Sequence, residues 1–243
     1  MAPEVICGSD GRKDIICYGQ QASNAVKPVA RLLFAVPGGQ ALCTGWLVRG
    51  SNDSTLITNN HCISDQNGVN SLQAKFNFQH TKCGGTVDEP SSDYAGGTFL
   101  RTSASLDYTL QTLQGNPEAT WGELIPTTLE PTAESRIVFP QHPGGNEKKV
   151  GAFEDSAQTI RCFVISTHQT YSPYAPGSQF NYGCDSEGGA SGSPIINASD
   201  RDRWHVWGLH HLGQVTINPC SNGATHMSTI CREAGALLTC AAD

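Results

Sequence analysis

The sequence predicts an all-β protein made of two packed, six-stranded antiparallel β-barrels with a short C-terminal helix. Its 26 glycines and 13 prolines are spread over 243 residues, which favours many turns and short strands. About a dozen short β-type runs, in two sets of six, suit a pair of small barrels. Only residues 231–240 have a helical composition.

The expected strands are apolar or β-branched runs that lie between turn residues. In the first half of the chain they cover 31–36, 43–48, 55–58, 72–78, 98–102 and 108–113. In the second half they cover 136–139, 148–153, 160–166, 194–197, 204–212 and 224–229.

The first 28 residues are polar and contain Cys7 and Cys17, so we expect an arm without helices that disulfides hold against the domain. The hinge between the barrels is expected near 114–121. We therefore treat residues 1–243 as one unit with three parts, which are the arm (1–28), the first barrel (29–116) and the second barrel (117–243).

Ten cysteines are scattered along the chain and form no C-x-x-C pair. This pattern favours disulfides in an oxidising compartment over a zinc module, so we expect a secreted, extracellular protein. Met1 leads directly into polar sequence, so we expect any signal peptide or pro-segment to be missing. A net charge of −7 and the lack of a long apolar run predict neither a nucleic-acid nor a membrane partner.

The stretch 185–196, D-S-E-G-G-A-S-G-S-P-I-I, concentrates glycines around the hydroxyl of Ser191. Glycines leave the backbone free of side chains, so the N–H groups of Gly189 and Ser191 can converge on an oxyanion. Ser191 is therefore a candidate nucleophile. Considered alone, the stretch is equally compatible with an ordinary turn before a strand.

A histidine and an aspartate precede Ser191 in the order expected of a Ser-His-Asp triad. His61 follows the apolar run 55–58 and precedes Cys62, which places an imidazole just past a strand end. Asp107 interrupts an apolar strand, where a carboxylate is costly unless it is paired. Each residue alone is more often structural, but the combination favours catalysis.

With these residues in place, the sequence resembles chymotrypsin-fold, trypsin-like serine endopeptidases, and most closely their bacterial lysyl-endopeptidase branch. The matching segments lie in order between about Cys7 and Cys220. They are D-G-R-K-D-I-I (10–16), C-T-G-W-L-V (43–48), I-T-N-N-H-C (57–62), F-N-F-Q-H-T-K-C (76–83), D-Y-T-L (107–110), Q-H-P-G-G-N-E-K-K-V (141–150) and G-A-S-G-S-P (189–194).

The resemblance implies a catalytic cleft between the barrels. His61 would be the general base and acid, Asp107 its orienter and Ser191 the nucleophile of a peptide-hydrolysing enzyme. One departure is that Asn59 and Asn60 replace the alanines usual before the histidine, which puts the local packing in doubt and leaves the chemistry intact.

The resemblance also implies the disulfides Cys43–Cys62 and Cys7–Cys83, although the cysteine arrangement is only partly shared. Among the other cysteines we favour Cys162–Cys184, because a bridge near the substrate pocket is common in this fold. The remaining choices are Cys17–Cys220 and Cys231–Cys240, and other pairings stay open.

Asp185 and Ser186 occupy the place, six residues before the nucleophile, where trypsin-like enzymes carry the carboxylate of the S1 pocket. They predict cleavage after Arg or Lys. The segment G-L-H-H-L-G (208–213) resembles G-I-H-W-G-G of glutamyl endopeptidases and predicts glutamate instead, through His210. His211 and Gly213 complete the expected pocket. We favour the basic preference, because Asp185 would repel a glutamate at low dielectric.

Three other functions can be compared with that of an active peptidase. An inactive homologue would bind a protein partner through the same cleft. An α/β-hydrolase requires the order Ser, Asp, His, which this chain does not have. A metal site at His210 and His211 requires neighbouring strand residues to face one side. We therefore expect a monomer without metal or cofactor, with protein or peptide substrates and protein inhibitors as partners.

Overall fold

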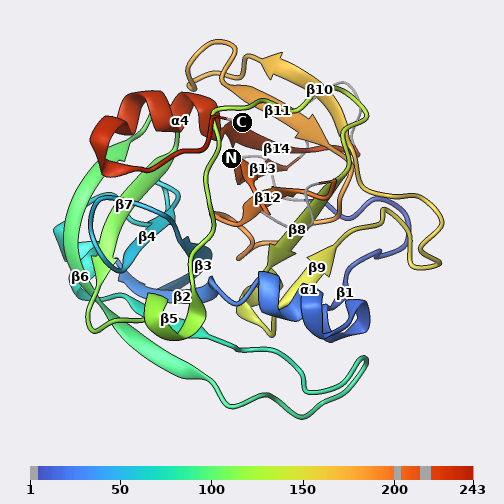
Figure 1. The fold of residues 1–243 in the computed structure, drawn as a ribbon, viewed down its shortest axis with the longest axis horizontal. Helices are drawn as coiled ribbons and strands as arrows, with labels where there is room; N and C mark the ends of the chain where they lie inside the picture. Colours follow the sequence, from blue (N-terminus) through green and yellow to red (C-terminus); the bar gives the residue numbers. More distant parts are fainter. Residues whose placement is uncertain (1–4, 200–203, 214–219, 243) are drawn as a thin grey trace.

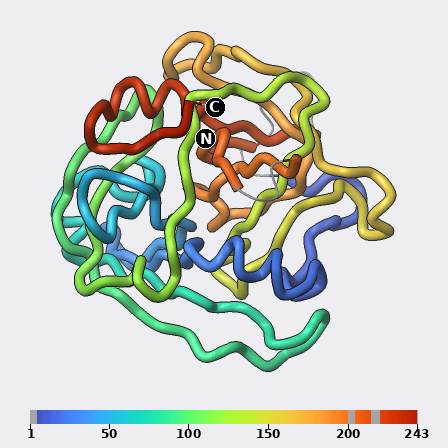
Figure 2. The backbone as a smooth tube through the Cα atoms, in the orientation of Figure 1, coloured from blue at the N-terminus to red at the C-terminus, as the bar shows by residue number. Residues whose placement is uncertain are grey.

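The computed structural model describes residues 5–199, 204–213 and 220–242. It is mostly β-structure in two halves that lie side by side (Figure 1). The backbone trace shows the N-terminal segment running along the second half before the chain enters the first (Figure 2). The prediction of an all-β, chymotrypsin-like fold is confirmed.

The first half is a closed six-stranded barrel with the order β2-β3-β4-β7-β6-β5. Its interior holds buried apolar side chains such as Leu32, Leu56 and Phe76. The strands are β2 (Val29–Val36), β3 (Gly39–Leu47), β4 (Thr55–Thr58), β5 (Gln73–Phe76), β6 (Ser92–Ser103) and β7 (Tyr108–Leu113). The six strands expected from the first half of the sequence are therefore all present.

The second half is a curled eight-stranded sheet with the order β1-β9-β8-β12-β13-β14-β11-β10, where a closed six-stranded barrel was expected. The two additional strands are β1, from the arm, and β11, where Gln179 and Asn181 are polar and yet all four residues are buried. The strands are β1 (Lys13–Asp14), β8 (Ile137–Gln141), β9 (Lys149–Gly151), β10 (Val164–Gln169), β11 (Gln179–Tyr182), β12 (Pro194–Asn197), β13 (Val206–Gly213) and β14 (Asn222–His226).

The arm contains two short helices, so the expectation of a helix-free arm is wrong. The 3₁₀ helix η1 (Ile15–Tyr18) and α1 (Gln20–Ala25) follow β1, and Ile15 anchors them in the core. The remaining short helices are α2 (Gln66–Asn70), α3 (Glu118–Trp121) and the 3₁₀ turns η2 (Pro143–Gly145) and η3 (Gly235–Leu237).

The C-terminal helix α4 (Met227–Ala234) begins four residues earlier than the helical composition predicted. It follows the last strand of the second half but lies beside the first barrel (Figure 1). Glu233 fixes it there, because its carboxylate pairs with Arg101 and accepts a hydrogen bond from Tyr108. Within the described residues, no helix is long and apolar enough to cross a membrane.

Four disulfides are formed, and three of them match the expected pairs Cys43–Cys62, Cys162–Cys184 and Cys231–Cys240. The expected Cys7–Cys83 bridge is wrong, because Cys83 pairs with Cys17. The arm explains this pairing. Asp14 accepts the N–H of Gly84, which brings η1 beside Cys83.

The expected Cys17–Cys220 bridge is therefore also wrong. Cys7 and Cys220 are not joined by a disulfide in the structure, and their side chains lie within hydrogen-bond contact of each other. Burial, followed by the contact with Cys220, raises the pKa of Cys7 to about 12. The thiol of Cys7 is therefore protonated at neutral pH.

Candidate active site

His61 and Asp107 meet between the two halves of the molecule. The Nδ1 atom of His61 lies 2.7 Å from Oδ2 of Asp107, and the backbone N–H of His61 donates to Oδ1 at 2.9 Å. The carboxylate therefore holds both the ring and the backbone of the histidine. With Nδ1 engaged in this way, Nε2 is the nitrogen that remains for a nucleophile.

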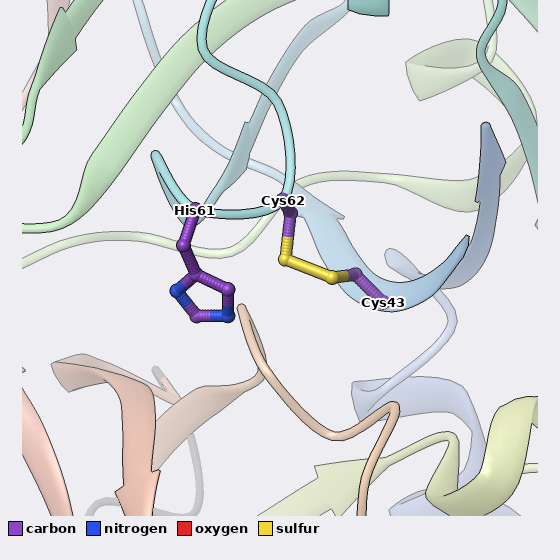
Figure 3. A group of neighbouring side chains, drawn as sticks. All are labelled: Cys43, His61 and Cys62. Carbon is purple, nitrogen blue, oxygen red and sulfur yellow. A yellow bond between two sulfur atoms is a disulfide. The ribbon is translucent and has the colours of Figure 1, made fainter. Parts of the chain in front are cut away.

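The disulfide Cys43–Cys62 braces the loop that carries His61. Figure 3 shows the imidazole pointing away from the disulfide, toward a loop with the colour of the segment near residue 190. The sulfur atoms are bonded to each other, so this group of side chains offers no thiolate to a metal ion.

Asp107 is buried and touches a second imidazole, because Nδ1 of His211 lies 3.0 Å from Oδ2. Burial alone would raise the pKa of Asp107. The contacts with His211 and His61 outweigh burial and hold the pKa of this carboxyl well below its usual range. Asp107 is therefore ionised at any pH at which the protein would work.

His211 was expected in the S1 pocket, and its ring contacts Asp107. Its Nε2 lies 2.5 Å from Oε1 of Gln179, and the edge of the Tyr174 ring packs against it at a centroid distance of 4.6 Å. Burial lowers the pKa of His211, although Asp107 opposes that shift. The alternation of side chains along β13 explains the placement, since His210 and His211 face opposite sides of the sheet.

Asn59, which with Asn60 replaces the alanines usual in the family, contacts the backbone of Asp107. Its Nδ2 donates to the backbone carbonyl of Asp107 at 2.8 Å, and Asn60 donates to Oγ1 of Thr102 at the same distance. Asp107 has a φ of +50°, a conformation uncommon for a residue with a side chain. The amide of Asn59 therefore helps to hold an unfavourable backbone geometry.

The loop of Ser191 is tied to the first barrel through Thr44, which is next to Cys43. The N–H of Thr44 donates to the carbonyl of Ser191 at 2.8 Å, and its hydroxyl donates to the carbonyl of Gly189 at 2.8 Å. Thr44 therefore connects the nucleophile loop with the strand that the disulfide joins to the histidine loop. The sequence offered no signal for this role.

Two glycines in the loop cannot be replaced without a clash. Gly192 has a φ of +90°, and a Cβ there would lie 2.1 Å from the carbonyl oxygen of Thr44. Gly189 has a φ of +98°, and a Cβ there would lie 2.8 Å from the carbonyl oxygen of His142. Within the described residues the N–H of Gly189 donates no hydrogen bond. An N–H that is to bind an oxyanion must have no other acceptor.

Asp185 is fully buried, and the arm supplies its hydrogen bonds. The N–H of Cys7 donates to Oδ1 and the N–H of Gly11 donates to Oδ2, each at 2.8 Å. Burial raises the pKa of Asp185, and the two amide bonds only partly oppose this. The sequence did not predict that the arm reaches this carboxylate.

Ser186, His210 and Gly213, which were also expected in the S1 pocket, are buried as well. The hydroxyl of Ser186 donates to Oδ1 of Asn222 at 3.0 Å, and Gly213 pairs with Asn222 across β13 and β14. Asn222 also donates to the carbonyl of Cys184 at 2.7 Å, a role missed in the sequence. His210 packs against Phe139, and its Nδ1 lies 2.5 Å from the hydroxyl of Tyr182.

The fold and the neighbouring His61 and Asp107 define the class as the chymotrypsin-fold serine proteases. Within that class, the chain belongs to the lysyl endopeptidase C-terminal domain family, whose model matches residues 8–226.

Two curated relatives and one solved structure illustrate the similarity. The chain is 32% identical over 217 residues to secreted RxLR effector protein 73 of Plasmopara viticola, which covers 86% of the chain and 51% of that protein. It is 25% identical over 215 residues to lysyl endopeptidase of Pseudomonas aeruginosa, covering 80% of the chain and 43% of that protein. The chain thus spans about half the length of both curated relatives.

A glutamyl endopeptidase structure solved with MPD has the same fold, with a TM-score of 0.64 at 18% identity, covering 94% of this chain and 96% of that one.

Proposed function

We propose that this protein is a secreted serine endopeptidase that cleaves peptide bonds after arginine or lysine. The observation that carries the proposal is the 2.7 Å contact between His61 and the buried, ionised Asp107 beside the loop of Ser191. Secretion is supported by the four disulfides and by a relative that is named as secreted.

In the proposed mechanism, the hydroxyl oxygen of Ser191 attacks the carbonyl carbon of the scissile bond while Nε2 of His61 takes the hydroxyl proton. The N–H groups of Gly189 and Ser191 stabilise the oxyanion that forms. The imidazolium then protonates the leaving amine, which leaves an acyl-enzyme. Water, deprotonated by His61, hydrolyses the ester and restores Ser191.

Asp107 contributes by stabilising the imidazolium that forms at each proton transfer. The carboxylate is held by two imidazoles and by the N–H of His61, so it needs little rearrangement when the charge on His61 appears. His211 acts through Asp107 and is a positioning residue.

Asp185 supports a basic preference at the residue before the scissile bond. A carboxylate has about four acceptor directions, and the two arm amides use two of them. Its raised pKa shows that the amides do not fully compensate for burial, so a cationic side chain would be favoured there. The P. aeruginosa relative, whose name is lysyl endopeptidase, agrees with this preference.

A glutamate preference is the second candidate, and His210 favours it. The ring is buried, and the backbone N–H of His210 donates to the carbonyl of Ser193, in the loop of Ser191, at 2.9 Å. The hydroxyl of Tyr182 fixes Nδ1, which directs Nε2 away from Tyr182. The similar glutamyl endopeptidase structure supports this candidate only at the level of the fold.

The test is hydrolysis of matched peptides that differ only in having Arg, Lys, Glu or Leu before the scissile bond. We expect kcat/KM to be highest for Arg or Lys, and D185N to remove that advantage while leaving the Leu peptide nearly unchanged. The loss expected for one hydrogen bond to a charged group is roughly 10- to 150-fold.

Two variants separate the alternatives in this experiment. S191A should lose roughly a millionfold in kcat, by comparison with another triad enzyme. Turnover within tenfold of the parent would refute the triad. A preference for Glu that H210V removes and D185N leaves intact would replace the basic preference, whereas equal losses on all peptides in D185N would show that Asp185 only anchors the arm.

A further inference from the structure

Three possible metal ligands gather on the second half of the molecule, outside the site described above. Glu130 lies in the connection that leads to β8, His168 lies in β10, and His226 ends β14 directly before α4. One ligand atom from each lies within 4.8 Å of the others. The two imidazole rings are stacked, with centroids 5.3 Å apart.

His226 is the unusual member of this group. Its side chain is 0% exposed, and within the described residues neither ring nitrogen has a hydrogen-bond partner. The backbone of Gln179 lies close to the ring but outside hydrogen-bond geometry. Leaving a buried polar atom without a partner costs about 1–3 kcal/mol, so an imidazole with two such atoms calls for an explanation.

The ring is also placed to bind a metal. A fully buried imidazole whose nitrogens have no hydrogen-bond partner within the described residues can offer a nitrogen lone pair to an ion. One nitrogen faces the cluster formed by His168 and Glu130. A metal ion would supply the partner that the protein does not.

We propose that Glu130, His168 and His226 bind a zinc ion and leave a fourth position open. Two imidazoles and one carboxylate form a common zinc ligand set. Nε2 of His168 and Oε2 of Glu130 are 3.2 Å apart, close to the separation of about 3.4 Å between two ligands in a tetrahedron with bonds of about 2.1 Å.

The surroundings of the three ligands suit an ion that enters from solvent. The side chain of His168 is 61% exposed and that of Glu130 is 29% exposed, while His226 closes the inner side. Ser228 donates a hydrogen bond to the other carboxylate oxygen of Glu130. Such a contact orients a carboxylate toward its metal.

The ion would be connected to the proposed triad through neighbouring residues of β14. Thr225 precedes His226, and its hydroxyl lies 3.3 Å from Nε2 of His211. Zinc would thereby join the connection at Glu130, β10 and the β14–α4 junction. We expect it to stabilise the second half of the protein without taking part in peptide hydrolysis.

A second cluster provides a matched control. His80 lies near Asp88 and Glu147, with Nε2 to oxygen distances of 3.8 and 3.9 Å. Its Nδ1 already contacts Asp14 at 3.1 Å, so the ring is not without a partner. The cluster at His80 therefore offers histidine and carboxylate ligands, but it has no buried imidazole like that of His226, whose ring nitrogens have no partner within the described residues.

The test is calorimetric titration of the chelator-treated full chain with Zn²⁺, with the absorption spectrum of bound Co²⁺ as a second readout. The parent should bind one ion per chain at this site, and its melting temperature should rise with Zn²⁺. H168N and E130Q should each weaken binding roughly 100-fold or more and abolish the rise. Asparagine at 168 tolerates the φ of +54° found there, and both residues are accessible, so these variants should fold.

H80N should bind zinc as the parent does, and H61A should also retain the ion at the proposed site. Circular dichroism verifies the fold of each variant. An absence of zinc binding by the parent would overturn the proposal. Binding that survives both H168N and E130Q, or that H80N or H61A abolishes, would also overturn it.

Discussion

Two buried aspartates in this molecule differ in what surrounds them. Asp107 is held by two imidazoles and an amide, and its pKa falls below the ordinary value. Asp185 is held by two backbone amides of the arm, and its pKa rises. The hydrogen bonds outweigh burial at Asp107, where two side chains can carry positive charge, but do not outweigh it at Asp185.

The difference agrees with the two distinct roles that we propose for these aspartates. Asp107 is charge-compensated within the protein, which suits a residue that must stabilise a neighbouring imidazolium throughout catalysis. Asp185 remains under-compensated, which suits a residue that receives a cation from outside. Asp185 also has a structural role, because its carboxylate accepts hydrogen bonds from the arm and so holds residues 7–11 against the second half.

The largest expected difference between the two aspartates is in kcat. D107N should reduce kcat by roughly 10⁴-fold, as the equivalent change does in another triad enzyme, because the amide no longer fixes the required tautomer of His61. D185N should leave kcat on a Leu peptide within tenfold of the parent. Steady-state kinetics on both variants measures this, and a similar loss in both would remove the distinction.

A smaller effect is expected at His211, which touches Asp107 but is remote from Asp185. H211L should cost roughly 10- to 150-fold in kcat/KM, the range for losing one hydrogen bond to a buried charge. The loss should be the same for Arg, Lys, Glu and Leu peptides, since the residue acts on the triad. A change in the order of preference would place His211 in the S1 pocket.

The smallest effect is in the pH dependence of stability, where the two aspartates should act with opposite sign. Because the pKa of Asp107 is depressed, its stabilisation is complete above about pH 4 and is lost as the pH falls through the folded pKa. Because the pKa of Asp185 is raised, the native state holds more protons just above pH 4, and stability falls as pH rises there.

Denaturant unfolding between pH 2 and 7 should reveal this as two contributions of opposite sign to the slope of the unfolding free energy against pH. D107N should flatten the loss of stability on the acid side. D185N should flatten the decrease above about pH 4. Slopes of the same sign at the two sites would contradict the assigned environments.

The sequence predicted the fold and the candidate triad because both depend on local patterns. Short β-runs between turns placed all six strands of the first barrel, while β11 was missed because Gln179 and Asn181 are polar yet buried. Their burial depends on neighbouring strands, as for Gln179, whose amide contacts the hydroxyl of Thr225 on β14. A run of four residues does not reveal such partners.

The contacts that the sequence did not predict join residues that are far apart in the chain. The arm reaches Asp185 across more than 170 residues, and Cys17 pairs with Cys83 only because β1 and η1 place it there. The contact of His211 with Asp107 was also not predicted, since the resemblance of 208–213 to a glutamyl-endopeptidase pattern pointed to the S1 pocket. The proposed zinc ligands Glu130, His168 and His226 are also far apart in the chain and share no sequence motif.

The most direct test of the central claim is labelling of Ser191 with an active-site-directed fluorophosphonate, followed by intact-mass measurement and peptide mapping. An active triad should take up one label per chain on Ser191, with none in S191A and much slower labelling in D107N. A folded parent that remains unlabelled, under conditions in which a control serine protease is fully labelled, would contradict the account and identify the chain as an inactive homologue that binds through its cleft.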